Sequence, residues 1–481
     1  MDQLELDVII IGAGTAGLSA RREVAKHTKR YLVFDDGPLG TTCARVGCMP
    51  SKVLIEVANL YHRRHSMAAF GIQGGEALTV SPERIMEHVR SLRDRFVRSV
   101  TEDMGSWTSE HLVRERACIE SPGRIRAGGK TYQTKSLIIA TGSSPVFPSG
   151  WKEFQHLLMD TDTFFEQKAL PSSLAVIGLG VIGAELGQGL SRLGIKVTGI
   201  GDASSIGGIT DPDMKPYVQK TFEHEMDIRS GRAQGLSSTQ DGQLVISMEG
   251  QDPVIVDKAL LAMGRRPNLE GLGMENLSIE KGPDNLPLVD TGTWELKGCE
   301  SVFLVGDSNR SRMILHEAAD QGRIAGYNAI HPKKQCFRQR VPLGITFTYP
   351  NVATAGEKFQ ELKAAGTPFV AGFASFEGQG RAIVKDAEKG MIKIYAHEET
   401  GTLLGAEIFA PEGEHLAHLL AWCIESQLDV FRVLSLPFYH PVLEEGLRTA
   451  LRDASQKVKK DKPDLELLRC QDPPAGTSSH N

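Results

Sequence analysis

The 481-residue sequence lacks several features that would assign it to a class at once. No run approaches the roughly 18 consecutive apolar residues that a membrane-spanning helix requires, and the acidic N-terminus does not resemble a signal peptide. The net charge of −6 lacks the basic excess of a nucleic-acid-binding protein. The seven cysteines are odd in number and scattered, unlike a secreted disulfide framework. These absences predict a cytoplasmic protein that acts on neither membranes nor nucleic acids.

Glycine, by contrast, is abundant at 50 residues, and some of it falls in two repeated motifs. The first motif follows an apolar run that is typical of a strand buried on both faces, and a helical pattern follows it. The next predicted strand ends at an acid. In such a unit the pyrophosphate of a dinucleotide rests on the helix N-terminus, and the acid accepts a hydrogen bond from a ribose hydroxyl. The residues with these expected roles are Gly12, Gly14, Gly17 and Asp35.

The same pattern recurs farther along the chain, which predicts a second nucleotide site. Its glycines are Gly178, Gly180 and Gly183. Gly201 stands where the acid is expected, and Asp202 follows it. Asp202 either starts a turn only or also disfavours a 2′-phosphate, and we favour the second interpretation, which predicts NAD rather than NADP. Between the two units, a stripe of apolar residues predicts one long helix over 81–104.

Cys43 and Cys48 are separated by four residues, shortly after the first unit. A structural disulfide is not expected in a reducing compartment, and a metal site would need a second set of ligands at suitable spacing. A redox-active disulfide fits the location. Arg45, Lys52 and a helix start expected around Val46 would lower the pKa of these thiols. We predict no metal site, and we interpret three further candidate ligands as surface residues of a helix: Glu414, His415 and His418.

Together, these motifs resemble the flavin-dependent pyridine nucleotide–disulfide oxidoreductases, and within that family the dihydrolipoamide dehydrogenase branch. The Cys-x4-Cys run ends in Pro50-Ser51-Lys52, as in that branch, and the resemblance extends from Leu6 to about Leu451. It implies an α/β fold with two Rossmann-like dinucleotide-binding domains, for FAD and NAD, and a C-terminal α+β dimerisation domain. The implied divisions are an FAD-binding domain over 1–150 and 272–342, an NAD-binding domain over 151–271, a dimerisation domain over 343–470 and a disordered tail over 471–481.

The resemblance also implies a role for individual residues. Cys43 would be the interchange thiol that faces the substrate, and Cys48 would face the flavin as the charge-transfer thiolate. Lys52 would lie near the flavin and pair with Glu185. Gly264 belongs to the motif that closes the NAD domain. The remaining expected FAD contacts are Thr42, Thr141, Gly142 and Asp307.

Near the C-terminus, the run from His440 to Glu445 resembles the family's His-Pro-x-x-x-Glu motif. Disulfide exchange needs a base that takes a proton from a substrate thiol, and imidazole titrates near neutrality. Glu445 would orient the ring and stabilise its cation. In the family this pair reaches into the active site of the other subunit, so the resemblance implies a homodimer. The implied activity is oxidation of dihydrolipoamide by NAD, with lipoyl domains of 2-oxo acid dehydrogenase complexes as candidate partners.

The sequence departs from the branch in places, and these departures leave alternatives open. Tyr349 stands where an aspartate is more frequent, and Arg22 and Arg323 fall where glutathione reductases place substrate-contacting arginines, although we favour ordinary surface charge. One alternative is therefore NAD(P)H-dependent reduction of a low-molecular-weight disulfide such as glutathione disulfide. A transhydrogenase or diaphorase that uses no disulfide is another, against which the cysteine pair and His440 argue. A third is a non-catalytic redox-sensing or NAD-binding subunit.

Overall fold

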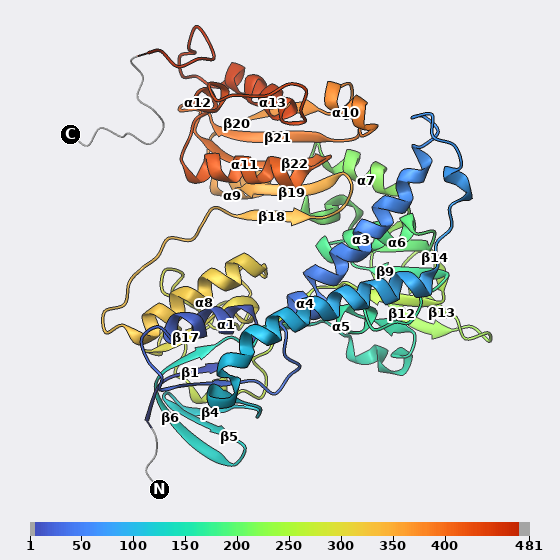
Figure 1. The fold of residues 1–481 in the computed structure, drawn as a ribbon. Helices are drawn as coiled ribbons and strands as arrows, with labels where there is room; N and C mark the ends of the chain where they lie inside the picture. Colours follow the sequence, from blue (N-terminus) through green and yellow to red (C-terminus); the bar gives the residue numbers. More distant parts are fainter. Residues whose placement is uncertain (1–4, 471–481) are drawn as a thin grey trace.

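The computed structural model describes residues 5–470 as three regions, each built around its own sheets (Figure 1). The tail that was predicted to be disordered, 471–481, lies outside the described residues. Within 5–470, no helix combines the length and the apolar character needed to cross a membrane.

The first region is a largely parallel sheet centred on β1 (Glu5–Ile11). β1 pairs in parallel with β2 (Tyr31–Phe34) and β6 (Lys130–Ile139), and β17 (Val302–Leu304) returns from far along the chain to pair with β6. The side chains of Val8, Ile9 and Ile10 are fully buried, as the sequence pattern predicted for a strand covered on both faces. The short strands β3 (Leu112–Val113), β4 (Cys118–Ser121) and β5 (Arg124–Ala127) complete the sheet.

Two helices lie side by side on one face of this sheet, α1 (Thr15–Val24) and α8 (Leu315–Ile330) (Figure 1). They approach closely because Gly322 has no side chain, and a Cβ there would lie 2.1 Å from the carbonyl oxygen of Ala16. The long helix α4 (Pro82–His111) begins where it was predicted but ends seven residues later than position 104. The extension is stabilised by His111, whose Nδ1 lies 3.0 Å from the carbonyl oxygen of Tyr31 and whose ring stacks on the tyrosine.

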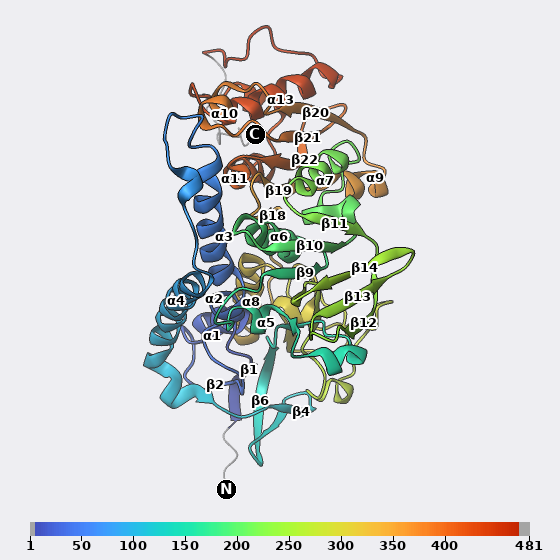
Figure 2. The ribbon, with the colours of Figure 1, turned by 90° about the vertical axis from the view of Figure 1, so that its right-hand side faces the viewer.

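The second region repeats this architecture in a five-stranded parallel sheet. Its strands are β8 (Leu158–Met159), β9 (Ser173–Ile177), β10 (Lys196–Gly201), β11 (Asp227–Ser230) and β15 (Lys258–Leu261), and helices α6 (Val181–Arg192) and α7 (Lys215–Glu223) pack on it. A small antiparallel sheet of β12 (Ala233–Ser238), β13 (Leu244–Met248) and β14 (Gln251–Val256) flanks it. Helix α3 (Cys48–His62) packs against both α4 and α6, and so joins the first two regions (Figure 2).

The third region is an antiparallel sheet with two differently used faces. Its order is β18 (Leu343–Thr346), β19 (Asn351–Gly356), β22 (Leu403–Ala410), β21 (Met391–His397) and β20 (Phe369–Ser375). Ile392, Ile394 and Ile408 face a core with α11 (Gly413–Glu425) and α13 (Glu444–Lys457). The alternate residues point away from that core, and Phe409 packs in the core of the second region.

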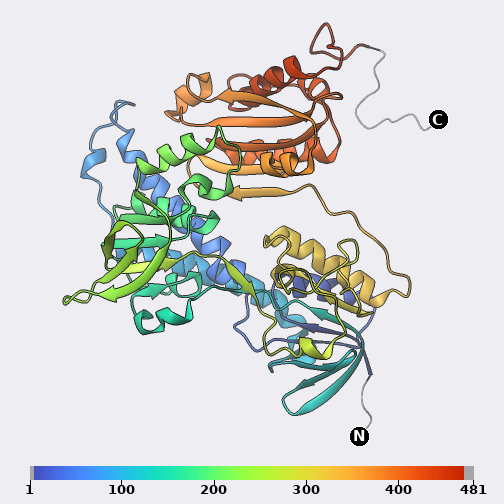
Figure 3. The same ribbon diagram turned by 180° about the vertical axis from the view of Figure 1, so that it is seen from behind.

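A segment without helix or strand, 331–342, joins α8 to β18 along the side of the molecule (Figure 3). Short elements complete the described chain, namely α2 (Thr42–Val46), α5 (Thr161–Phe164), α9 (Phe359–Ala365), α10 (Gly380–Lys385), α12 (Val430–Leu434), β7 (Ser143–Pro145) and β16 (Arg265–Pro267).

Candidate active site

Two glycine turns of matching geometry stand at the ends of β1 and β9. Gly12 has a φ of +107°, and an added Cβ would lie 2.3 Å from the carbonyl oxygen of Ala140. Gly178 has a φ of +104°, and its Cβ would lie 2.3 Å from the carbonyl oxygen of Ala262. Any side chain at either position would collide with backbone, so only glycine fits. Gly17 and Gly183 are equally constrained, since a Cβ would lie 1.9 and 1.8 Å from the carbonyl oxygens of Gly12 and Gly178.

The residues around both turns fit a bound dinucleotide. Gly14 and Gly180 are the N-cap residues of α1 and α6 and supply no side-chain cap, and nothing lies within 4 Å of a Cβ built at either glycine. The first amides of both helices are therefore open to a phosphate. Asp35 accepts hydrogen bonds from the N–H groups of Ala13 and Gly37 at 2.6 and 2.9 Å. Burial raises the pKa of Asp35, and its placement suits a ribose hydroxyl.

Further expected FAD contacts meet at the pair of strands β7 and β16. Ser143 Oγ donates a hydrogen bond to Asp307 at 2.8 Å and accepts one from Arg265 Nε at 2.8 Å. Gly142 and Gly264 both have positive φ angles, +68° and +96°. The Thr141 hydroxyl beside them is buried and has no hydrogen-bond partner within the described part of the chain. An unpartnered buried hydroxyl of this kind fits a polar group of a bound cofactor.

Asp202 follows the end of β10 and is exposed. Its Oδ1 accepts hydrogen bonds from Ser204 N and Ser204 Oγ at 3.0 and 2.8 Å, and so it caps the short 3-10 helix Ala203–Gly208. Asp202 therefore does start a turn, which agrees with both interpretations. The bonds use one carboxylate oxygen and leave the other open to solvent or ligand.

Cys43 lies on the short helix α2, and Cys48 lies on the longer helix α3 that follows it. The helix expected to start around Val46 begins two residues later, at Cys48, because α2 occupies the residues up to Val46. Gly47 separates the helices with a non-helical backbone, and a Cβ there would lie 3.1 Å from the carbonyl oxygen of Thr42. Cys48 thus occupies the first position of α3, where helix amides and the helix dipole stabilise a thiolate.

The two thiols differ in acidity. A hydrogen bond from Cys43 and, to a smaller extent, the positive charge of Lys52 together lower the pKa of Cys48 to about 7. The same contact raises the pKa of Cys43 above that of an ordinary thiol. Cys43 is half-buried and Cys48 is exposed, and both are free thiols. In this reduced state the negative charge therefore resides on Cys48.

Lys52 and Glu185 form the ion pair that was expected from the resemblance. Lys52 Nζ lies 2.8 and 3.0 Å from the two carboxylate oxygens of Glu185, which is only 4% exposed. Phe347 completes this group, since its N–H donates to Glu185 Oε1 at 2.8 Å and its ring centroid lies 4.6 Å from Lys52 Nζ. Sequence reasoning missed Phe347, because a backbone donor leaves no signature in residue type.

His440 and Glu445 also lie together, at the start of α13. His440 Nδ1 lies 3.1 Å from both oxygens of Glu445, and Val442 N donates to the same carboxylate at 3.3 Å. The histidine holds the pKa of Glu445 below its ordinary value. The His440 side chain is 79% exposed, and so is open to a substrate or to a second chain.

Other residues noted in the sequence lie outside this group. Arg22 and Arg323 are exposed on helices, 3.9 and 3.6 Å from Asp103 and Asp320 respectively. Tyr349 is bonded to α6 through its backbone: its N–H donates to Gln188 Oε1 and its carbonyl oxygen accepts from Arg192, both at 2.7 Å. Glu412, Glu414 and His415 offer ligand atoms within 4.8 Å of one another, but His415 is largely exposed.

Comparison with known proteins gives a consistent result. Residues 6–322 match the family described as pyridine nucleotide-disulphide oxidoreductase, and 343–451 match its dimerisation domain. The chain is 30% identical over 453 residues to dihydrolipoyl dehydrogenase of Thermus scotoductus, covering 92% of this chain and 96% of that protein. It is 31% identical to mitochondrial dihydrolipoyl dehydrogenase of Rattus norvegicus, covering 94% and 91%.

Solved structures share the fold. LpdA of Mycobacterium tuberculosis superimposes with a TM-score of 0.80 at 24% identity, covering 92% of this chain and 99% of that one. The HOCl-induced flavoprotein disulfide reductase RclA of Escherichia coli, in a Cu(II) complex, also reaches a TM-score of 0.80, at 19% identity, covering 94% and 100%. The predicted fold class, two Rossmann-like regions followed by a dimerisation domain, is thereby confirmed.

Proposed function

Because the chain belongs to the pyridine nucleotide–disulphide oxidoreductase family, we propose that it oxidises a dihydrolipoyl dithiol with NAD⁺ as acceptor. Membership makes it a disulfide oxidoreductase that uses FAD and a nicotinamide nucleotide, and its dimerisation domain makes it a homodimer. The names of its relatives in Thermus scotoductus and Rattus norvegicus support the dithiol as substrate. The dithiol loses two electrons and two protons, NAD⁺ gains a hydride, and one proton is released.

The observation that carries this proposal is the position of Cys48, at the first residue of α3 and one turn before Lys52, which makes it the more acidic of the two thiols. In the oxidised enzyme these residues form a disulfide, and a substrate thiolate attacks the sulfur of Cys43. Cys48 then leaves as a thiolate, because the thiol with the lower pKa is the better leaving group. The second substrate thiol attacks the mixed disulfide, which releases the cyclic disulfide product and leaves Cys43 as a thiol.

FAD, when bound by the first glycine turn, Asp35 and Asp307, supplies the relay of an electron pair from the dithiol couple to the nicotinamide. The chain's own residues prepare the charge for that relay. Lys52 holds a positive charge near the Cys48 thiolate, and Glu185 fixes the position of that ammonium group. Phe347 in turn fixes Glu185 through its N–H group.

Proton transfer is assigned to His440 of the partner subunit. It would take the proton from the first substrate thiol and return one to Cys43 when the product leaves. Glu445 holds Nδ1 of the ring, so Nε2 is the nitrogen that remains for the substrate. The 79% exposure of His440 in a single chain supports a role completed across the dimer.

The preference for NAD rests on the loop after β10. Residues 201–214 include no lysine or arginine that could hold a 2′-phosphate, and Asp202 would repel one. An acid at this place suits the free hydroxyl of the adenosine ribose. We also propose lipoyl domains of 2-oxo acid dehydrogenase complexes as carriers of the dithiol, which the same assay tests with a lipoylated domain as substrate.

A substrate panel tests the proposal. Initial rates are measured for dihydrolipoamide with NAD⁺ and with NADP⁺, and for glutathione disulfide with NADH and with NADPH. We expect kcat/KM for dihydrolipoamide and NAD⁺ to exceed the other combinations by about 100-fold. A higher value for glutathione disulfide with NADPH would replace this function by the low-molecular-weight disulfide reductase.

Two serine variants test the disulfide route. Cys48→Ser should abolish the dihydrolipoamide–NAD⁺ reaction, because no disulfide can form. Cys118→Ser is the matched control, since Cys118 is a half-buried thiol on β4, and its activity should equal that of wild type. Full activity in Cys48→Ser would favour a diaphorase that bypasses the cysteine pair.

A further inference from the structure

A fully buried carboxylate lies between the third region and the second nucleotide-binding region. Glu407 of β22 is 0% exposed and faces away from the core formed with α11 and α13. It accepts hydrogen bonds from Thr210 N at 2.6 Å, from Asp211 N at 3.2 Å and from Phe359 N at 3.0 Å, and also from the hydroxyl of Thr210. Four donors on one carboxylate compensate for the loss of water around a buried charge.

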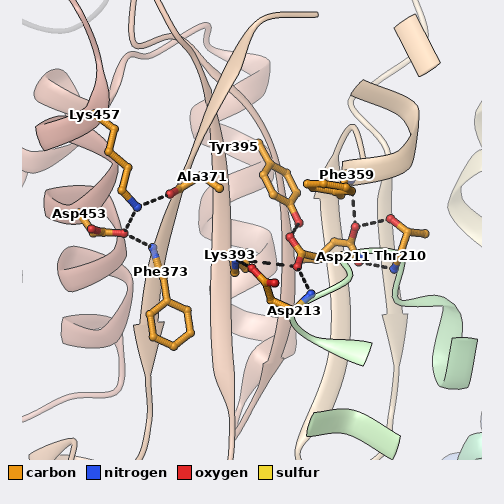
Figure 4. Close-up of polar contacts among 11 residues, drawn as sticks. Thr210, Asp211, Asp213, Phe359, Ala371, Phe373, Lys393, Tyr395, Asp453 and Lys457 are labelled. Atoms are coloured by element: carbon orange, nitrogen blue, oxygen red, sulfur yellow. Dashed lines mark hydrogen bonds and ion pairs between the residues drawn. The ribbon is translucent and has the colours of Figure 1, made fainter. Parts of the chain in front are cut away.

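Asp211, whose N–H donates to Glu407, belongs to a larger group of polar contacts (Figure 4). Asp211, which is 1% exposed, accepts hydrogen bonds from the Tyr395 hydroxyl at 2.9 Å and from Asp213 N at 2.9 Å. Lys393 Nζ lies 2.6 Å from an Asp213 oxygen. The segment 210–213 is therefore held to two adjacent strands of the C-terminal sheet by backbone and side chain alike.

This anchored segment directly continues the loop that follows β10. Gly207 N donates to the carbonyl oxygen of Leu179, inside the second glycine turn, at 3.1 Å. The carbonyl oxygen of Gly207 accepts from Thr346 Oγ1 at 3.3 Å, and that of Gly208 accepts from Lys358 Nζ at 3.1 Å. The loop that begins at Asp202 is thus fixed between the glycine turn and the C-terminal sheet.

We propose that Glu407 is a positioning residue for the nicotinamide dinucleotide. It fixes residues 202–211 so that Asp202 and the second glycine turn present one binding surface to the adenosine half of the cofactor. The inference rests on the nicotinamide-nucleotide part of the proposed function and is independent of the dithiol. Its physical basis is that a loop which samples several arrangements binds more weakly, in proportion to the population of the binding arrangement.

The decisive variant is Glu407→Gln, which keeps the shape but loses the charge and turns an NH₂ group toward two of the four donors. We expect the dissociation constant for NAD⁺, measured by isothermal titration calorimetry on the holoenzyme, to rise about tenfold if the loop keeps its binding arrangement about a tenth of the time. The KM for NAD⁺ should rise in parallel, with kcat at saturating NAD⁺ and the KM for dithiol unchanged. Amide hydrogen exchange should accelerate in peptides covering 202–211.

The matched control is Asp453→Asn on α13. Asp453 accepts from Phe373 N at 2.8 Å and from Lys457 Nζ at 2.6 Å, so it also bridges to the C-terminal sheet but makes no contact with the 202–211 loop (Figure 4). Its affinity for NAD⁺ should equal that of wild type. Equal loss of affinity in both variants would mean general damage to the sheet and would overturn the proposal.

Tyr395→Phe is a milder variant, and it tests whether the contacts of the loop with the C-terminal sheet set the affinity for NAD⁺ if Glu407→Gln does not fold. It removes only the hydroxyl that donates to Asp211 and should raise the dissociation constant for NAD⁺ by a smaller factor. Wild-type affinity in every folded variant would overturn the proposal. Absence of NAD⁺ binding by the wild-type enzyme would instead refute the proposed cofactor, so the two failures are distinguishable.

Discussion

The acidity of Cys48 gives a prediction with a definite magnitude. Its pKa is lowered from 9.0 to about 7, chiefly by a hydrogen bond from Cys43 and then by Lys52. Because Cys48 is exposed and solvent screens the interaction, a shift of two units sets an upper bound of about 2.7 kcal/mol on the preferential stabilisation of the thiolate. Two variants separate the causes, because Cys43→Ser keeps a hydrogen-bond donor and Cys43→Ala removes it. Both also remove the competing thiol from the assay.

The assay is the rate of alkylation of Cys48 by iodoacetamide across pH 5–10, followed by mass spectrometry of the peptide that contains it. The midpoint should lie near pH 7 in Cys43→Ser and move toward 9 in Cys43→Ala, because the thiolate loses its donor. At pH 7 the thiolate fraction then falls about 50-fold, while the nucleophilicity of each thiolate rises about six- to tenfold, so the net rate falls about five- to eightfold.

A further substitution in the Cys43→Ser background measures the contribution of the neighbouring charge. Lys52→Met should raise the midpoint above that of Cys43→Ser, since the ammonium group that favours the thiolate is lost. The control, Lys130→Met, changes an exposed lysine of β6 and should leave the midpoint where it was. Identical midpoints in Cys43→Ser and Cys43→Ala would refute the hydrogen bond as the main cause.

Three further predictions concern stability, proton transfer and cofactor choice. Lys52→Met should lower the free energy of unfolding, measured in urea, by about 3 kcal/mol, near the low end for a broken buried ion pair because Lys52 is partly exposed. The control Arg124→Met breaks the exposed pair with Glu120 and should cost no more than about 1 kcal/mol. Equal costs would contradict the assigned burial of the Lys52–Glu185 pair. His440→Gln should lower kcat/KM for dihydrolipoamide about 10²- to 10⁴-fold, with a smaller loss in Glu445→Gln, and unchanged steady-state rates would remove the histidine from proton transfer. Asp202→Ala should raise the KM for NAD⁺ about tenfold or more, as expected for a lost hydrogen bond to a charged group. It should also lower the KM for NADP⁺, because the charge that repels the 2′-phosphate is removed. An unchanged ratio of the two KM values would mean that Asp202 only caps the turn.

Much of the site could be predicted from the sequence because its parts are local. The glycine turns, the cysteine pair and the His440–Glu445 pair each occupy a few consecutive residues with a fixed backbone requirement. Fold class followed from the same motifs, since a strand, a glycine turn and a helix specify a nucleotide-binding unit wherever they recur.

The features that sequence reasoning missed depend on contacts between distant segments. The N–H of Phe347 on Glu185 joins residues of two regions through a backbone atom, so residue type gives no indication of it. The start of α3 and the end of α4 were misplaced for a related reason. Gly47 interrupts the helical pattern at one site, and burial of His111 against Tyr31 lengthens the helix at the other.

Strand β22 has a consequence for how the chain length can vary. The side chains of Ala406 and Ile408 pack in the core beneath α11 and α13, and α13 begins beside the His440–Glu445 pair. Glu407, between them in the strand, points to the other side and accepts a hydrogen bond from the loop that follows β10. Because side chains alternate along a strand, inserting or deleting one residue within β22 would drive the carboxylate into the apolar core and expose the core residues on the other side. One such change would therefore disturb both the His440–Glu445 pair and the loop proposed to bind the nicotinamide dinucleotide. Length changes should therefore be tolerated in the turn at 398–402 and rejected within the strand itself.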